Sequence, residues 1–115
     1  MKRDFLDYVE DIVNAMRSAS TFIEGMTFRQ FQRDQKTVFA AVRALEIIGE
    51  AVKKIPGPVR DRYPEIPWKD MAGMRDKLIH EYFGVNLPTL WNTIKKEIPK
   101  LEPQFERILR DYESS

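Results

Sequence analysis

The stretch DFLDYVEDIVNAMRSASTFIEG, residues 4–25, decides the fold. Its apolar residues recur at steps of three and four, which is the spacing of one face of an amphipathic helix. These residues are Phe5, Tyr8, Val9, Ile12, Val13, Met16 and Ala19. The pattern predicts a helix from about Asp4 to Glu24, and Gly25 follows it as a C-terminal glycine commonly does. No alternating strand pattern longer than four residues occurs elsewhere, so the chain is predicted to be all-α.

Two further helices are predicted in the first half of the chain. Thr27 and Gln30 have capping-box spacing for a short helix that ends near Phe31, and Asp34 is placed to cap a long helix. The long helix carries one apolar stripe, made of Val38, Val42, Leu45, Gly49 and Val52. A glycine inside a helix costs about 1 kcal/mol relative to alanine, so Gly49 is expected to allow a close helix approach.

Prolines and glycines divide the second half. Residues 56–58, Pro-Gly-Pro, are expected to close the long helix, and residues 63–68 to form a stiff connector. A helix is predicted over 68–83, with Gly84 as its stop. Asn86 is predicted to cap a last helix over 87–112, which Pro99 and Pro103 must break or bend. The expected architecture is an up-and-down bundle of four to five main helices.

Composition narrows the functional classes. The 115 residues fit one domain, 1–115, and contain 43% hydrophobic and 32% charged residues, as in a soluble globular protein. The absence of cysteine excludes disulfides, thiolate catalysis and zinc–sulfur sites, and a single histidine argues against a zinc site within one chain. We therefore expect no metal and no cofactor. There is no signal-peptide pattern and no apolar run long enough to cross a membrane, so the expected location is the cytoplasm.

The segment MRDKLIHEYFGV, residues 74–85, contains the only histidine, His80. Histidine titrates near neutral pH, and an arginine such as Arg75 offers a planar cation suited to phosphate. Asp76 and His80 are four residues apart, so on a helix Asp76 can orient the imidazole. Arg75 and His80 would point about 140° apart on a regular helix. The alternative is that both are ordinary polar residues beside an inward face of Met71, Met74, Leu78 and Ile79.

Glu46 is a second candidate, because it lies within the apolar run ALEIIG, residues 44–49. It is interpreted as a partly buried carboxylate paired with an arginine such as Arg43, and the alternative is the solvated edge of the stripe. Trp68 and Trp91 are interpreted as core anchors.

Arg75, His80 and Tyr82 together spell Arg-x4-His-x-Tyr. With its context IPW…AGMRDKLIHEYFGV, residues 66–85, this motif resembles that of the HepT-like toxins of the HEPN superfamily. The opening DFLDY (4–8), the stretch RALEIIGEA (43–51) and Trp91 resemble their counterparts there too.

The resemblance implies a two-fold dimer and a metal-independent endoribonuclease, the toxin of a prokaryotic type VII toxin–antitoxin pair. The implied substrate is RNA, either transfer or messenger, and not DNA. The implied partner is a small nucleotidyltransferase of the MntA type, which would inactivate the toxin by placing AMP on Tyr82. In this reading Arg75, His80 and Asp76 are catalytic, while Glu46 and Arg43 support the site.

The chemistry itself also favours a dimer. Metal-free RNA cleavage needs a general base, a general acid and a cation for the developing phosphorane charge. One chain has a single histidine, so a second copy would supply the other proton-transfer group. Two other functions compete with the nuclease: a non-catalytic helical partner that presents a nucleotidyltransferase with its substrate, and a purely structural dimerisation module.

Overall fold

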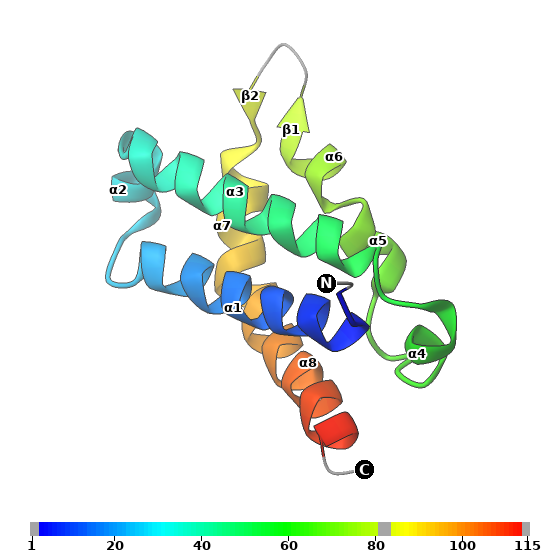
Figure 1. The fold of residues 1–115 in the computed structure, drawn as a ribbon. Coiled ribbons are helices and arrows are strands. Elements are labelled where there is room, and N and C mark those ends of the chain that lie inside the picture. Colours follow the sequence, from blue (N-terminus) through cyan, green and yellow to red (C-terminus); the bar gives the residue numbers. More distant parts are fainter. Residues whose placement is uncertain (1–2, 81–83, 114–115) are drawn as a thin grey trace.

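Two long helices, over residues 5–23 and 35–52, pack against each other. The computed structural model describes residues 3–80 and 84–113, and of Ile79 and His80 it describes the backbone. Helix α1 (Phe5–Ile23) begins at Asp4, whose carboxylate accepts a hydrogen bond from the Leu6 backbone N–H at 3.1 Å. Helix α3 (Gln35–Val52) packs along α1 (Figure 1). Gly25 ends α1 with a φ of 77°, a left-handed conformation that glycine adopts without strain.

The predicted caps of the next two helices are confirmed. Thr27 and Gln30 exchange hydrogen bonds at the start of α2 (Phe28–Arg33). The Asp34 carboxylate accepts a hydrogen bond of 3.0 Å from the Thr37 backbone N–H at the start of α3. This bond from Thr37 is the main reason why the pKa of Asp34 lies below its usual value. The sequence therefore marks both helix starts correctly.

The connector after α3 is more structured than predicted. Helix α3 ends at Val52, and Pro56-Gly57-Pro58 begins the short helix α4 (Gly57–Asp61) instead of closing α3. Proline suits a first helical turn, where its missing N–H would have no helical partner. The stiff stretch from Tyr63 then leads into α5 (Trp68–Ala72).

The helix predicted over 68–83 is wrong. It divides at Gly73 into α5 and α6 (Met74–Leu78), after which the chain is extended. Strands β1 (Ile79–His80) and β2 (Gly84–Val85) form a two-residue antiparallel ladder, with Ile79 opposite Val85 and His80 opposite Gly84. The Asn86 N–H donates to the Leu78 carbonyl at 2.8 Å and extends this pairing.

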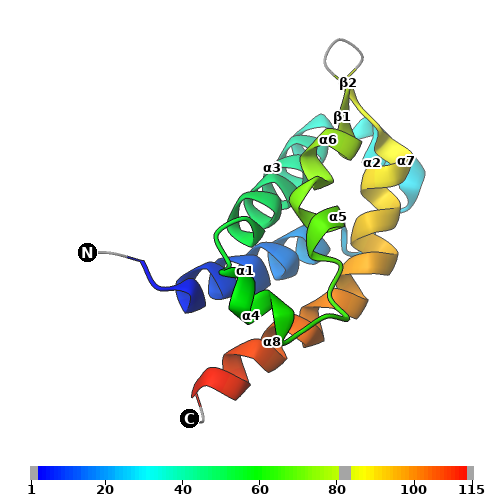
Figure 2. The same ribbon diagram turned by 90° about the vertical axis from the view of Figure 1, so that its right-hand side faces the viewer.

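The C-terminal third is one bent helical column. It consists of α7 (Leu87–Asn92), the π-helical turn η1 (Thr93–Glu97) and α8 (Ile98–Glu113) (Figure 2). Asn86 caps it as predicted, accepting a hydrogen bond from the Thr89 N–H at 3.1 Å. The prolines do not break this column: Pro99 is the second residue of α8, and Pro103 lies inside that helix.

One hydrophobic cluster joins all of these helices and confirms the all-α prediction. In Figure 1, α1 and α3 lie in front and α7 behind them, with α8 passing below. Trp68 is 9% exposed and packs edge-on against Phe105, so it is the core anchor that was predicted. At Gly49 an added Cβ would lie 3.4 Å from the Met71 carbonyl oxygen, which confirms the close approach of α5 to α3. No helix in the described ranges has both the length and the apolarity to span a membrane.

Candidate functional site

The residues of helix α6 divide sharply between buried and exposed. Met74 and Leu78 are 8% and 2% exposed and point into the core, as Met71 of α5 does. Arg75, Asp76 and Lys77 lie between these anchors and are exposed. The predicted inward face is thus confirmed for its described members, and it fixes the charged residues of the motif on the outside of the molecule.

Arg75 is paired with Glu46 across two helices. Its Nε donates a hydrogen bond of 3.1 Å to Glu46 Oε2 on α3. The Glu46 side chain is 26% exposed and that of Arg75 is 60% exposed, so the carboxylate is the more enclosed partner. The prediction that Glu46 is partly buried beside an arginine holds, but that arginine is Arg75 and not Arg43. Arg43 lies exposed on α3 and lines a groove with residues of α1.

This pairing leaves much of Arg75 open to solvent. Its hydrogen bond to Glu46 is the only one it makes within the described residues, and it uses Nε alone. The two terminal amino groups, which form the fork that suits two oxygens of one phosphate, lie at the outer end of the side chain. The arrangement can therefore hold the guanidinium in place while it receives an anion.

His80 lies beyond the end of the helix, and the expected helical geometry does not apply to it. Helix α6 ends at Leu78, and His80 belongs to β1, where its backbone pairs with Gly84. The predicted angle of 140° between Arg75 and His80 and the predicted i, i+4 contact with Asp76 both assumed a continuous helix. The hairpin replaces that assumption, because Ile79 and Val85 are β-branched residues that favour extended backbone.

One predicted contact and the predicted modification site fall outside the described residues. Asp76 is exposed near the start of α6, where its backbone N–H donates to the Gly73 carbonyl at 3.1 Å. Its predicted partner, the imidazole of His80, is a side chain outside the described part, and so is all of Tyr82. In the described ranges, no three acidic or histidine side chains gather in a way that could hold a metal ion.

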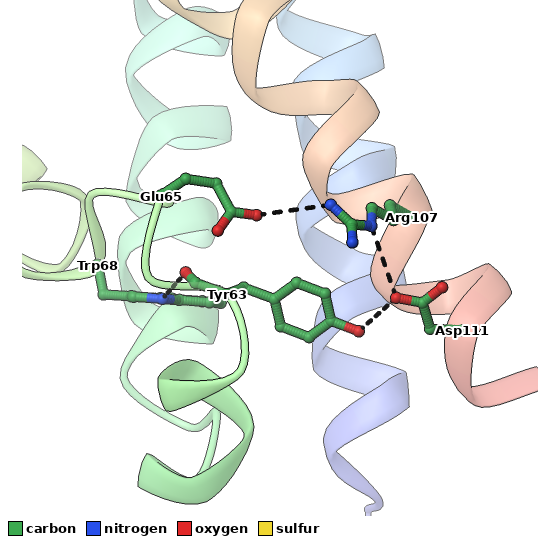
Figure 3. A network of polar contacts seen from close by, with 5 residues as sticks. All are labelled: Tyr63, Glu65, Trp68, Arg107 and Asp111. Atoms are coloured by element: carbon green, nitrogen blue, oxygen red, sulfur yellow. Dashed lines mark hydrogen bonds and ion pairs between the residues drawn. The ribbon is translucent and has the colours of Figure 1, made fainter.

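A second polar cluster, which joins the connector before α5 to helix α8, was not predicted. The Tyr63 hydroxyl donates a hydrogen bond of 2.8 Å to Asp111 Oδ2, and Arg107 lies 3.7 Å from Asp111 and 3.9 Å from Glu65 (Figure 3). The Trp68 Nε1–H donates to the Tyr63 carbonyl at 3.0 Å. Burial, with the adjacent Asp111 second, raises the pKa of Tyr63 to about 12. Separations of nearly fifty residues give no local sequence signal for such a cluster.

A family model described as "Ribonuclease HepT-like" matches residues 12–108. A probable ribonuclease HepT of Thermococcus cleftensis is 52% identical over 108 residues, which cover 94% of this chain and 98% of the relative. A candidate RNase of Methanocaldococcus jannaschii is 49% identical over 96% of this chain and 85% of its own length. Another, from Caldanaerobacter subterraneus subsp. tengcongensis, is 50% identical over 90% of this chain and 92% of its own. No solved structure matches.

Proposed function

Because the chain belongs to the family of HepT-like ribonucleases, we propose that it is a metal-independent endoribonuclease and the toxin of a type VII toxin–antitoxin pair. The observation that supports this most directly is the state of Arg75. Its Nε is held by Glu46 at 3.1 Å, while 60% of its side chain remains exposed on α6, the helix that leads into the strand with His80. A guanidinium fixed at one end and open at the other suits phosphate binding.

In the proposed reaction the ribose 2′-hydroxyl attacks the neighbouring phosphorus. A base removes the 2′-hydroxyl proton, the bond from phosphorus to the 5′-oxygen breaks, and an acid protonates the departing oxygen. The products are a 2′,3′-cyclic phosphate and a 5′-hydroxyl, and no water or metal is consumed. His80 is the proposed base or acid, and Arg75 stabilises the charge that builds up on the phosphorane oxygens. Asp76 is the proposed orienting group for His80.

The chain needs a second copy for this chemistry. A single chain has one histidine and a net charge of +1, which is little for an RNA-binding protein. In a two-fold dimer a second His80 supplies the other proton-transfer group, and a second Arg75 adds positive charge at the axis. The proposed site is therefore composite, with each copy contributing one arginine and one histidine.

The decisive experiment is RNA digestion with the purified protein in the presence of EDTA. Wild type is expected to cut RNA and leave 2′,3′-cyclic phosphate ends, and His80→Ala is expected to lose the activity by at least about a hundredfold. Expression without the partner should be toxic for wild type and harmless for His80→Ala. An equally active or equally toxic His80→Ala protein would refute the assignment. A wild-type protein without activity or toxicity would favour the non-catalytic role.

We also propose that a partner nucleotidyltransferase of the MntA type inactivates the protein by transferring AMP to Tyr82. The added phosphate is an anion that would compete with RNA for Arg75, and the adenosine adds bulk next to the motif. Mass spectrometry after incubation with the partner and ATP should show an AMP group on wild type and none on Tyr82→Phe. The idea fails if Tyr82 stays unmodified or if the modified protein still cuts RNA.

A further inference from the structure

A pocket lies at the base of the hairpin that carries His80. Its volume is about 310 Å³, near the lower end of the range for sites that bind small molecules. One wall is formed mostly by α5 and α6, and the other by α7, η1 and the start of α8 (Figure 2). The two walls meet at the hairpin, where the Asn86 N–H donates to the Leu78 carbonyl at 2.8 Å. This space, the hairpin pocket, therefore adjoins the motif.

Much of the lining of the hairpin pocket is apolar. Four of its side chains are buried in the core for most of their surface: Met71, Met74, Leu78 and Leu101. Two of them are methionines, whose thioethers make favourable contacts with aromatic rings. Such a lining can cover the faces of a flat aromatic ligand.

The charged side chains follow an order along the pocket. The first wall runs towards the hairpin from Asp70 to Lys77, and the second runs away from it from Thr89 to Glu97. Lys77 and Thr89 therefore lie at the end near the hairpin, and Asp70 and Glu97 lie at the far end. Glu97 is eight residues after Thr89, which is on the order of 10 Å of helix. The pocket thus has a cation near the motif and two carboxylates away from it.

These polar groups are available to a ligand. Asp70 and Glu97 are exposed, and neither side chain makes a hydrogen bond or an ion pair within the described ranges. Lys77 is exposed as well and has no carboxylate partner among those residues. The Thr93 hydroxyl, between the two ends, donates its proton to the Thr89 carbonyl at 2.8 Å, so towards a ligand it can only accept. The pocket therefore offers three acceptor groups and one cation.

This order of groups matches a nucleotide, and among the four bases of RNA it matches guanine. A lysine suits a phosphate, an apolar lining suits the faces of a base, and a carboxylate accepts N–H groups from its edge. The Watson–Crick edge of guanine presents N1–H and the 2-amino group side by side, which is enough for two carboxylates. Adenine and cytosine present a single amino group there. Uracil presents one N–H between two carbonyl oxygens, which a carboxylate repels.

We infer that the hairpin pocket binds a guanosine nucleotide of the RNA, with its phosphate at Lys77 and its Watson–Crick edge at Asp70 and Glu97. This inference rests on the proposed function, because it assigns the base that the nuclease selects. Lys77 follows Arg75 by two residues, so the guanosine adjoins the phosphate that is cut. A paired base has no free Watson–Crick edge, so the guanosine must be single-stranded.

The first test is nucleotide binding by the full chain, measured by NMR titration. Guanosine 5′-monophosphate should bind at least about tenfold more tightly than uridine 5′-monophosphate, and the inosine nucleotide, which lacks the 2-amino group, should bind between them. Asp70→Asn and Glu97→Gln each replace an acceptor oxygen by a donor amide, so each should lose most of this preference. Glu10→Gln, at an exposed position on α1, is the matched control and should keep it. Equal binding of the guanosine and uridine nucleotides, or no binding of the first, would overturn the inference.

Lys77→Ala tests the orientation of the nucleotide. It should weaken binding of guanosine 5′-monophosphate about tenfold and leave binding of guanosine, which has no phosphate, unchanged. Lys36→Ala, at an exposed position on α3, removes the same charge away from the pocket and should change neither. An equal loss for both ligands, or no loss for either, would refute the placement of the phosphate.

RNA cleavage separates this inference from the proposed function. The substrate is an oligouridine with one guanosine, compared with the same strand containing inosine, adenosine or cytidine at that position. Wild type is expected to cut next to the guanosine, and Glu97→Gln to cut without that preference. If the guanosine nucleotide binds as expected but no RNA is cut, the guanine site stands and the nuclease assignment fails.

If RNA is cut without regard to base and the guanosine nucleotide does not bind, the nuclease stands and the guanine site is wrong. Binding of the free nucleotide together with cleavage that ignores guanosine would make the pocket a site for free nucleotides. That result would also overturn its assignment to the RNA.

Discussion

The cluster around Tyr63 and the pair formed by Glu46 and Arg75 both join segments far apart in the chain, but they leave their charges in different states. Tyr63 is 3% exposed and its hydroxyl is bonded to Asp111, which Arg107 also approaches. Arg75 has one carboxylate at its Nε and an open guanidinium beyond it. The first arrangement encloses a polar group and stabilises the fold. The second holds a cation at the surface, where a ligand can reach it.

The largest effect should come from Arg75→Ala. Loss of a cation aimed at the developing phosphorane charge is expected to lower RNA cleavage by about a thousandfold. Stability should change little, because exposed ion pairs contribute about 1 kcal/mol at most. Cleavage kinetics and urea unfolding measure the two quantities. Arg107→Ala is the matched control, because it removes an equally exposed arginine from the other cluster, and it should retain full cleavage with an equally small change in stability. A comparable loss of cleavage in both variants would remove the contrast between the two clusters.

Trp68→Ala should destabilise the fold by about 3 kcal/mol, as large aromatic truncations in a core do. The substitution removes the packing against Phe105 and the hydrogen bond to the Tyr63 carbonyl. Denaturant unfolding followed by circular dichroism measures this. Trp91→Ala should cost less, because Trp91 is only partly buried beside Phe28 and Phe31. Equal costs would show that the connector is not anchored through Trp68.

Glu46 is predicted to position Arg75. Glu46→Ala should lower cleavage about tenfold, because nothing would then hold the Arg75 guanidinium in position. Glu46→Gln should retain most of the activity, because its amide oxygen can still accept the hydrogen bond from Arg75 Nε. Neither variant should alter the melting temperature by more than a few degrees. A role in stability alone would instead lower the melting temperature and leave the activity per folded molecule unchanged.

The smallest effect concerns Tyr63→Phe, which should cost about 1 kcal/mol at neutral pH through the lost hydrogen bond. The folded protein holds the Tyr63 proton up to about pH 12, but an unfolded tyrosine loses it near pH 10. The contribution of Tyr63 is therefore complete below pH 10 and declines as the pH rises to 12. Unfolding at several pH values should show the gap between wild type and Tyr63→Phe closing over that window, with Tyr8→Phe as control. A gap that stays constant would contradict the shift.

Local signals predicted most of the fold. The starts at Thr27, Asp34 and Asn86 are marked by side chains that bond within three residues, so the sequence contains the whole interaction. The break at Gly73 and the hairpin after Leu78 were missed. There, the helical spacing of buried residues continued to Leu78, whereas the pairing of Ile79 with Val85 joins residues six positions apart.

For the candidate site, too, local patterns predicted some features and missed others. The motif gave Arg75, His80 and Tyr82 by their spacing, and the inward anchors of α6 followed from periodicity. The partner of Glu46 did not follow, because Arg43 is three residues away and Arg75 is twenty-nine, and only tertiary packing selects the second. The hairpin pocket also escaped notice, since its two walls come together only when Ile79 pairs with Val85.

The π turn at Thr93–Glu97 determines where this gene segment can tolerate a change in length. The turn fits one more residue into each ring of backbone hydrogen bonding than an α-helix does, and one of its bonds runs from the Ile98 N–H to the Thr93 carbonyl. Losing one residue there would let the backbone return to α geometry while the residues downstream keep their orientation, so Leu101, Phe105 and Ile108 would stay in the core. Losing one residue from the regular helix α8 would instead rotate everything after it by about 100°. Among descendants of this sequence, single-residue deletions should therefore accumulate in the π turn and not in α8.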